Sequence, residues 1–370
     1  MSMFSASHHG VDRILFWTIV LLLVGGLLVF LSASLGLLAY DSGGFSGAAK
    51  SQILFGLGGG LVAFFIGMKV PYRFWRQYAL YIFIASLAGT LLVFVPHIGV
   101  ALNGAKRWIA LGPITFQPSE ILKVGYILYL AAWLSMAKNK IGEIRHGLIP
   151  FCVITGLAAV VLLLQPDTDT FLVIALSGLA MFIASGARAR DILLIVLAGV
   201  VGMAIIISFR PYIADRFTTF LHPTDDPRGS SYQIHQSLLA VGAGELFGRG
   251  FGQSIQKFGK LPEPISDSIF SVFAEEFGFL GSAALIVVYV TFAMRGLWVA
   301  ARSPDLFGGL LATGIVVLIT VQSFVNIAAM LGVLPLSGLP LVFISHGGSA
   351  LLVSLGAAGI LLSVSKSVRI

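Results

Sequence analysis

The stretch "ILFWTIVLLLVGGLLVFLSASLGLLA" (residues 14–39) contains no charged side chain. A helix needs about 20 apolar residues to cross the hydrocarbon core of a bilayer, whereas the apolar core of a cleavable signal peptide has only about 7–15. We therefore expect this run to be a retained transmembrane helix. The whole chain agrees, because 57% of its 370 residues are hydrophobic and only 11% are charged, against about 25% charged in soluble domains. This composition indicates an integral membrane protein with several spans.

Similar apolar runs recur along the chain. We predict an all-α polytopic membrane protein of about ten transmembrane helices, which form one integral membrane domain over residues 1–370. The two spans that flank "QPDTDT" (165–170) must meet in a very tight turn. An even number of spans places both termini on the same side of the membrane. The predicted spans are residues 14–39, 51–68, 77–95, 120–137, 148–165, 170–186, 192–210, 279–300, 307–331 and 346–364.

Lysine and arginine gather in one set of short connections and span ends, as they do in cytoplasmic loops. The opposite short segments hold mainly Lys50, Lys106 and Arg107. We therefore expect both termini in the cytoplasm. The net charge of +7 then needs no nucleic-acid partner to explain it. The gathered residues are Lys69, Arg73, Arg76, Lys138, Lys140, Arg145, Arg188, Arg190, Arg295 and Arg302, with Arg13, Lys366 and Arg369 near the termini.

This orientation leaves a large extracytoplasmic loop at residues 211–278, between spans 7 and 8, and also places residues 97–120 and 332–349 outside. These segments are too rich in apolar and aromatic residues for disorder, so we expect ordered, partly re-entrant structure. A short amphipathic helix is predicted around residues 233–241. The glycine-rich segment that follows, residues 242–257, contains five glycines and fits a series of turns. Its G-x-G-x-G pattern is only weak evidence for a phosphate cradle.

The outer loop ends in "KLPEPISDSIFSVFAEEFGF" (260–279), which crowds four carboxylates into a chain that has few. Asp267 precedes a run with helical apolar spacing, so it is either an N-cap or a general base whose pKa is raised by desolvation. Glu275 and Glu276 form a solvated rim if they are exposed, and either one needs a partner if it faces the bundle. Glu263 lies between two prolines and is a surface acid or a ligand for a cation.

A second group of polar residues lies in and before "FQPSEILKVGY" (116–126). Glu120 and Lys123 share a helix face, which suits a structural ion pair, although a lysine within a membrane helix is also a candidate for function. Arg107 can grip a phosphate with its planar guanidinium, and Trp108 suits the membrane interface.

The "QPDTDT" turn supplies Asp167 and Asp169, which fit turn chemistry, a cation site, or ion pairs with Lys123 or Arg107. The seven histidines are dispersed without the spacing of a zinc site, and the sequence contains no nucleotide-binding motif. The single cysteine, Cys152, allows no internal disulfide framework. The sequence therefore identifies no metal, and any energy source must arrive with the substrate.

Three classes of function fit such a chain. A transferase acting on a lipid-linked substrate predicts acids and bases in the outer loops at the membrane boundary. A transporter or lipid flippase predicts polar residues near the bilayer midplane and broken helices in two related halves. The candidate residues lie mostly on one side and no paired halves are visible, which favours the enzyme. A scaffold whose spans bind a partner is compatible with the 43 glycines but is not specifically indicated.

Three segments in order resemble the SEDS proteins of bacterial cell-wall synthesis: residues 103–123, residues 232–281 and "GVLPLSGLPLVFISHGGSALL" (332–352). With the ten-span layout, the likeness extends over nearly the whole chain. The segments "SIQK" and "QSLLA" are more similar to the cell-division member FtsW than to the elongation member RodA, which is the second choice.

The resemblance implies a peptidoglycan glycosyltransferase that polymerises lipid II at the outer face of the cytoplasmic membrane, with a class B penicillin-binding protein and other division proteins as partners. It implies that Asp267 is the catalytic base for attack by a sugar hydroxyl, with inversion and departure of a lipid diphosphate. Charge on that diphosphate is stabilised by cationic side chains or by a divalent cation; no cofactor is certain. The implied substrate-binding residues are Arg107, Glu120, Lys123, Asp167, Lys257, Glu263, Ser345, Gly347 and Gly348.

The chain departs from the family pattern at three positions. Ser266 and Ser268 flank Asp267, where the family often has threonine and phenylalanine. His346 replaces a common tyrosine in the last outer motif. These changes leave the role expected for Asp267 in place and concern the details of acceptor binding.

Overall fold

The predicted helical spans are present in the computed structural model, which describes residues 10–40, 42–102, 105–111, 114–138, 140–222, 229 and 231–368. Arg369 and residues 223–228 and 230 of the outer loop lie outside this range. The helices are α1 (Arg13–Tyr40), α2 (Ser42–Lys50), α3 (Gly60–Lys69), α4 (Tyr72–Leu91), α5 (Pro118–Met136), α6 (Leu148–Leu164), α7 (Thr168–Ala184), α8 (Ala189–Phe209), α9 (Pro211–Leu221), α10 (Tyr232–Ala243), α11 (Ile269–Ala301), α12 (Leu306–Met330) and α13 (Gly348–Ser365). A π-helical segment, Ser51–Gly59, joins α2 to α3, and a 3-10 turn, Leu92–Phe94, follows α4.

Each of the ten predicted spans coincides with one of these helices or, for residues 51–68, with the run from α2 to α3. Within the described residues, seven helical stretches are long and apolar enough to cross a membrane. The predicted spans at α5, α6 and α7 are not among these seven. The helices α6 and α7 are shorter, with 17 residues each, and α5 carries the buried pair Glu120 and Lys123. The predicted tight turn is confirmed, because α6 ends at Leu164 and α7 begins at Thr168.

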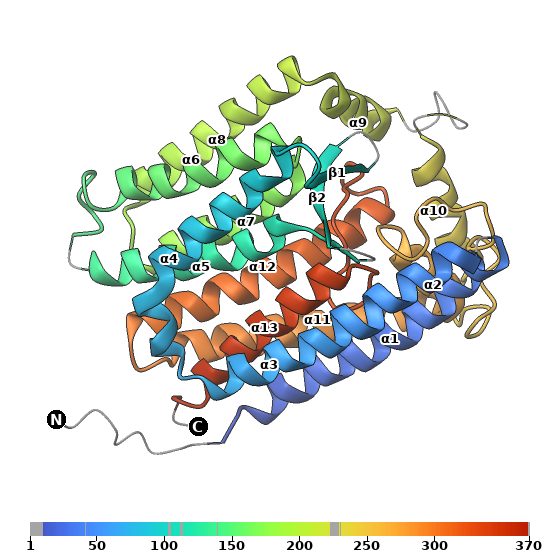
Figure 1. Cartoon of the computed structure of the whole chain (residues 1–370), viewed down its shortest axis with the longest axis horizontal. Coiled ribbons are helices and arrows are strands. Elements are labelled where there is room, and N and C mark those ends of the chain that lie inside the picture. The colour runs from blue at the N-terminus through green and yellow to red at the C-terminus, as the bar shows by residue number, and fades with distance from the viewer. Residues whose placement is uncertain are drawn as a thin grey trace.

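The start of α1 and the end of α13 lie together at one end of the bundle (Figure 1). The backbone N–H of Asp12 donates to Ser365 Oγ at 3.2 Å, and Arg295 Nη2 lies 2.7 Å from Asp12 Oδ2. The first and last spans are therefore held at the same level, as an even number of spans requires.

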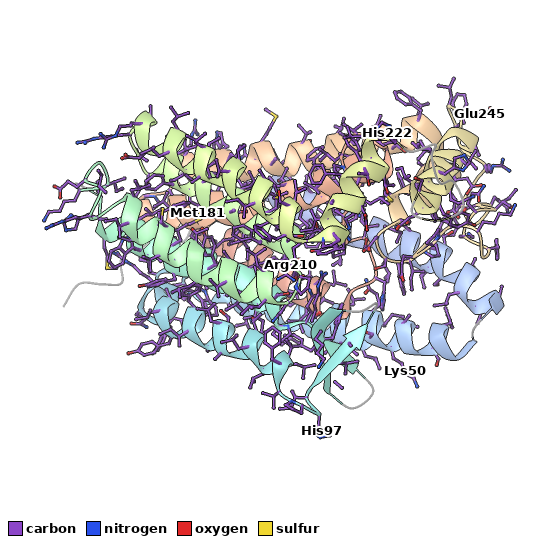
Figure 2. The ribbon with its side chains drawn as sticks, turned by 90° about the horizontal axis from the view of Figure 1, so that it is seen from above. Lys50, His97, Met181, Arg210, His222 and Glu245 are labelled. Atoms are coloured by element: carbon purple, nitrogen blue, oxygen red, sulfur yellow. The ribbon has the colours of Figure 1, made fainter. Side chains whose placement is uncertain are left out.

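The opposite end of the bundle carries the sheet and the helices α9 and α10 (Figure 1). In Figure 2, Lys50, His222 and Glu245 lie toward this end. The prediction of α10 around residues 233–241 is confirmed. The segment at residues 97–120, expected to be an ordered outer loop, forms a small antiparallel sheet of β1 (Gly99–Leu102), β2 (Ala105–Leu111) and β3 (Ile114–Phe116).

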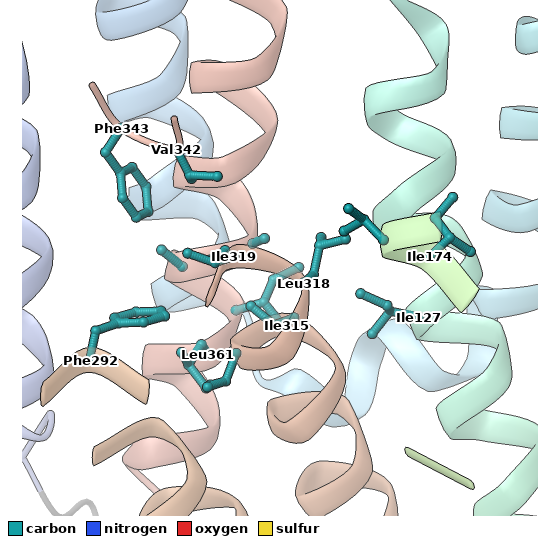
Figure 3. Packing of buried hydrophobic residues seen from close by; sticks show 14 of the residues in the cluster. Ile127, Ile174, Phe292, Ile315, Leu318, Ile319, Val342, Phe343 and Leu361 are labelled. Atoms are coloured by element: carbon teal, nitrogen blue, oxygen red, sulfur yellow. The ribbon is translucent and has the colours of Figure 1, made fainter. Parts of the chain in front are cut away.

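The core is built around α12. Ile315, Leu318 and Ile319 of α12 are buried among side chains of α5, α7, α11 and α13 (Figure 3). By contrast, α8 buries only Asp191 and exposes its apolar side chains, as a lipid-facing helix does. The two arrangements place α12 at the centre of the bundle, where its polar residues can reach the outer segments from the inside.

The helix α11 begins ten residues earlier than the predicted span at residues 279–300, and it is broken at Gly278, whose φ is +67°. The break frees backbone groups that pair with the glycine-rich segment: Phe279 N donates to Glu245 O at 2.8 Å, and Gly250 N donates to Glu276 O at 2.9 Å. A Cβ at Gly278 would lie 2.3 Å from the backbone nitrogen of Gly248. The glycines therefore serve close backbone packing, which favours the turn interpretation over a phosphate cradle.

Candidate active site

Asp267 lies in a turn that is fixed from several sides. Asn326 Nδ2 of α12 donates to Asp267 O at 2.8 Å, Ser345 Oγ donates to Ser266 O at 2.7 Å, and His346 N donates to Ile265 O at 2.7 Å. The residue that caps α11 is Ser268, and it makes no side-chain cap bond. Asp267 is therefore not an N-cap, and its carboxylate remains available for chemistry.

The Asp267 carboxylate is part of a charged cluster that spans three parts of the chain. Arg216 Nη1 of α9 lies 2.8 Å from Asp169 Oδ2 of α7, and Gly338 N donates to the same oxygen at 3.0 Å. A Cβ at Gly338 would lie 3.8 Å from both Asp169 Oδ2 and Asp267 Oδ2, and 3.9 Å from Arg216 Nη2. Two carboxylates and one guanidinium therefore converge on Gly338.

The pKa of Asp267 is raised to about 7. Burial is the largest cause, and the negative charges of Glu263 and Asp169 add to it. The hydrogen bond from Ser266 and the positive charge of Arg216 act in the opposite direction. A carboxylate with a pKa near the working pH is suited to accept a proton from a hydroxyl.

Glu120 and Lys123 are buried under this cluster. Their side chains are each 3% exposed, and Lys123 Nζ lies 2.8 Å from Glu120 Oε2. Lys123 Nζ also donates to Gln322 Oε1 at 2.8 Å, and Gln322 Nε2 donates to Pro340 O at 3.0 Å. The pair therefore supports the segment that carries Gly338, through one glutamine of α12.

Arg107 and Asp167 form the expected ion pair, with 3.6 Å between Arg107 Nη1 and Asp167 Oδ1. Arg107 also donates from Nε to Gln165 O at 3.2 Å and from Nη2 to Pro166 O. The side chain is 21% exposed, against 3% for Asp167. These contacts attach β2 to the α6–α7 turn, immediately before the first turn of α7 that presents Asp169.

The three expected ligands in the last outer motif have other partners. Ser345 Oγ accepts from Leu341 N at 2.8 Å as well as donating to Ser266 O, and it is buried. Gly347 N donates to Gln52 Oε1 at 2.9 Å. A Cβ at Gly348 would lie 2.7 Å from Ser51 O. These contacts position the Asp267 turn and pack α13 against the α2–α3 run, and they leave no polar group of Ser345 directed at a substrate.

Lys257 also differs from the expectation. Its side chain is 0% exposed, and Nζ bonds Glu276 Oε1 at 2.7 Å, Ser32 Oγ at 3.0 Å and Gly252 O at 2.9 Å. The expected contact of Lys257 with substrate phosphates is therefore inconsistent with its place in the structure, where its charge is matched inside the protein. Its role is to fix the glycine-rich segment to α1 and α11.

Glu275 and Glu276 are both buried, so neither forms a solvated rim. Glu275 accepts from Ser254 Oγ at 2.5 Å, from Ile255 N at 3.0 Å and from Gln256 N at 3.2 Å. Of the four acids in the segment 260–279, Glu275 and Glu276 thus hold the glycine-rich segment and Glu263 is exposed. Asp267 is the one that lies beside Asp169 and Arg216.

Arg216, Gln322 and Asn326 are parts of this site that sequence reasoning missed. Arg216 lies in an amphipathic helix of the outer loop that was not predicted, and its charge did not stand out from that of other loop residues. Gln322 and Asn326 are polar residues four apart on an otherwise apolar helix, a spacing that places both on one face. That spacing was the available signal for a buried polar contact.

A small cavity borders the cluster. It has a volume of about 180 Å³ and is lined by Asp215, Arg216, Thr219, Phe220, Ile234, Leu238, Leu331, Gly332, Leu334 and Leu336. Most of these side chains are apolar, whereas Arg216 brings a cation to its wall. The guanidinium of Arg216 thus lies between an apolar recess and the Asp267 carboxylate.

Over the described residues, no three histidine, cysteine, aspartate or glutamate side chains are grouped as ligands for a metal ion. In the Asp267 cluster, Asp169 is already bonded to Arg216 and Gly338. A divalent cation here would have to take most of its ligands from substrate phosphates and water, as Mg²⁺ commonly does.

Known proteins resemble this chain over most of its length. The model of the FtsW, RodA and SpoVE family, described as cell cycle protein, matches residues 13–370. Stage V sporulation protein E of Bacillus subtilis is 38% identical over 97% of this chain and 98% of its own. A probable peptidoglycan glycosyltransferase FtsW of Geobacter sp. strain M18 is 37% identical over 98% of both chains.

Two solved structures share the fold. A chain from a study titled "Structural coordination of polymerization and crosslinking by a peptidoglycan synthase complex" superimposes with a TM-score of 0.77 at 28% identity, over 96% of this chain and 97% of that one. The rod shape determining protein RodA of Thermus thermophilus superimposes with a TM-score of 0.69 at 27% identity, over 96% of each chain.

Proposed function

This chain belongs to the FtsW, RodA and SpoVE family of cell cycle proteins, and we propose that it is a peptidoglycan glycosyltransferase that polymerises lipid II into glycan strands during cell division. Relatives of the FtsW type that are 36–37% identical carry this glycosyltransferase activity in their names. The observation that carries the proposal in this chain is the placement of Asp267 in the charged cluster at the end of the bundle opposite the termini.

The reaction takes place at the outer face of the cytoplasmic membrane. Arg73, Arg76, Arg295 and Arg302 lie toward the end of the bundle where the chain begins and ends, which the positive-inside rule assigns to the cytoplasm. Both termini are then cytoplasmic, and the loop at 211–278 with Asp267 is extracytoplasmic. A lipid-linked sugar presents its diphosphate at headgroup level while its hydrocarbon tail stays in the bilayer, so the reacting atoms meet Asp267 at that boundary.

Asp267 acts as the general base. Its carboxylate takes the proton from the 4-hydroxyl of the acceptor sugar as that oxygen bonds to the anomeric carbon of the growing strand. The bond from that carbon to the lipid diphosphate breaks, with inversion of configuration, and the diphosphate leaves with its electron pair. The pKa of about 7 allows Asp267 to be ionised at neutral pH and still hold a proton readily.

Arg216 is the cation best placed to stabilise the leaving diphosphate. Its side chain is 33% exposed and lines the small outer cavity, whereas Lys123 and Lys257 are buried in ion pairs. A preorganised cation at the position where negative charge develops lowers the barrier. A divalent cation held by the diphosphate, with the exposed Glu263 as an additional carboxylate whose charge acts on Asp267, would supply the same neutralisation.

The Glu120, Lys123 and Gln322 network and the Arg107–Asp167 pair support the site. Through Pro340 and through the α6–α7 turn, they set the positions of Gly338 and Asp169 next to Asp267. In this proposal their contribution to substrate binding is indirect, because both ion pairs are largely buried beneath the outer surface.

A class B penicillin-binding protein is the proposed partner, together with other division proteins. A structural neighbour comes from a study whose title describes a complex that coordinates polymerization and crosslinking. A polymerase that produces uncrosslinked strands requires such a transpeptidase. The apolar side chains Leu246, Phe247 and Phe251 are exposed on the outer loop and are available to a partner or to membrane lipids.

The experiment that tests the proposal compares wild type and Asp267→Asn, each purified with its partner, in polymerisation of labelled lipid II. The asparagine keeps the shape and cannot accept the proton, so we expect strand formation to be lost while thermal unfolding is unchanged. Turnover retained by the folded variant would remove Asp267 from the reaction. Translocation of labelled lipid II by both proteins without polymer would instead favour the flippase alternative, and genetic complementation of an elongation rather than a division defect would favour the RodA-type role.

A further inference from the structure

A second cavity lies at the other end of the bundle, where the chain begins and ends. Its volume is about 820 Å³, which is within the range of small-molecule and cofactor sites. It is formed by the start of α4, the ends of α5, α7 and α11, and the start of α12. None of the residues of the Asp267 site lines it.

The cavity brings together two cations that have no ion-pair partner among the described residues. Arg76 of α4 and Lys138, two residues beyond α5, both line it and are both exposed. The Arg76 guanidinium carbon lies 5.8 Å from the centre of the Phe307 ring, which also lines the cavity. An arginine held over an aromatic ring is oriented but keeps its hydrogen-bond donors free.

Asp305 is the only acid among the described lining residues, and it is already used. Its Oδ2 accepts from Tyr72 OH at 2.6 Å and from Arg73 Nε at 3.0 Å, and its Oδ1 accepts from Gly308 N at 2.8 Å. Arg73 therefore matches its charge outside the cavity. Within the described part of the chain, the positive charges of Arg76 and Lys138 therefore remain uncompensated.

A polar group without a partner also lies on the wall. Ser303 Oγ is buried and has no hydrogen-bond partner within the described part of the chain. A buried hydroxyl normally finds a partner. A ligand oxygen in the cavity would supply one, which is a second indication, independent of the cations, that the cavity holds a polar group.

Apart from Ser135 and Thr313, the rest of the lining is mainly apolar and includes Leu297 and Leu310. Leu297 is 43% exposed, and Met294, one turn earlier on α11, is 69% exposed. The apolar wall is therefore continuous with a helix face that contacts lipid. A ligand with an anionic head and hydrocarbon chains matches this arrangement better than a free anion does.

We propose that this cavity binds the phosphate headgroup of an anionic glycerophospholipid, with Arg76 and Lys138 on the phosphate, Ser303 on a headgroup oxygen, and the acyl chains leaving along α11. Basic pockets between transmembrane helices on the cytoplasmic side bind such headgroups. The inference is independent of the catalytic role of Asp267, and it makes the anionic lipid a structural ligand of α4, α5, α11 and α12 rather than a substrate.

The test counts lipids bound to the purified full-length protein by native mass spectrometry, with phosphatidylglycerol and phosphatidylcholine of the same acyl chains. Wild type is expected to retain phosphatidylglycerol in preference to phosphatidylcholine. Because one basic residue near the membrane surface is worth about fivefold in affinity for an anionic lipid, Arg76→Gln/Lys138→Gln is expected to lose about 25-fold. Arg76→Lys/Lys138→Arg, which keeps both charges, is expected to retain the lipid.

The matched control is Lys140→Gln/Arg145→Gln, which removes the same charge from exposed positions on the same side that do not line the cavity. This variant is expected to bind like wild type. Equal binding by wild type and Arg76→Gln/Lys138→Gln would overturn the site, and so would an equal loss in the control. Displacement by inorganic phosphate would assign the cavity to a free anion, and preferential retention of undecaprenyl phosphate would assign it to a polyprenyl lipid.

Discussion

The Asp169–Arg216 pair offers a quantitative test of the active-site electrostatics. Asp169→Asn removes one negative charge beside Asp267 and releases the guanidinium that Asp169 now holds at 2.8 Å. Both effects favour the ionised form of Asp267, so its pKa must fall. The other charged group that faces Asp267 is Glu263 of its own turn, while Asn326 and Ser266 contact it as neutral groups.

The size of the effect follows from the geometry. Asp169 Oδ2 and Asp267 Oδ2 each lie 3.8 Å from the Cβ position of Gly338, so they are at most twice that distance apart. At an effective dielectric constant of about 20, two unit charges about 7 Å apart interact by about 2 kcal/mol. One pKa unit corresponds to about 1.4 kcal/mol, so the pKa of Asp267 is expected to fall by about one to two units.

The assay is the initial rate of lipid II polymerisation between pH 5 and pH 9. A base with a pKa of about 7 is protonated at acidic pH, so the wild-type rate is expected to rise through pH 7 and to reach a plateau above it. For Asp169→Asn the rise is expected one to two pH units lower, with a reduced plateau because a weaker base accepts the proton less readily.

Two controls separate this effect from a general loss of charge. Asp169→Glu keeps the carboxylate and should keep the wild-type midpoint. Asp215→Asn removes a carboxylate that is next to Arg216 in the sequence, and it should also keep the wild-type midpoint. A midpoint for Asp169→Asn that equals that of wild type or moves to higher pH would refute the electrostatic coupling between Asp169 and Asp267.

Three further predictions concern the support of the site. Lys257→Met leaves Glu276 buried without its partner and is expected to destabilise the protein by about 3–5 kcal/mol, whereas Lys257→Met/Glu276→Leu should recover most of this in thermal unfolding in detergent. Gly278→Ala forces a side chain into a left-handed backbone conformation and against Gly248, so we expect a large loss of folded protein, measured as monodisperse yield. Gln322→Leu breaks the bonds to Lys123 and Pro340, so the rate of polymerisation should fall roughly 10- to 100-fold through misplacement of the Asp267 cluster; a rate equal to wild type would show that this support is unnecessary.

The spans, their order and the even count could be predicted because each apolar run carries its own signal for the bilayer. Water is absent there, so every backbone group must be satisfied within the helix, and length and composition suffice. Hydropathy did not predict the sheet at residues 97–116 or the early start of α11. Both lie outside the hydrocarbon core, where neighbouring segments rather than the bilayer decide the backbone.

Asp267 could be singled out from its position before a helix, but its competing roles could not be separated from the sequence. The N-cap interpretation failed because Ser268 occupies that position. Lys257 was wrongly expected to face substrate, because a basic residue in an outer loop has the same sequence signature whether it is free or buried against Glu276. Only the packing of α1 against α11 shows that its charge is already matched.

By itself, the sequence determined that this chain is a membrane-embedded helical bundle, with most lysines and arginines on one side and the candidate site residues on the other, because hydropathy and charge act locally on each segment. The tertiary structure decided which of those charges meet. Asp169, Arg216 and Gly338 come from three segments far apart in the chain, and they converge on Asp267 because polar residues of α12 hold the outer turns from below. Electrostatic energies depend on such distances, and no local pattern of residues contains them.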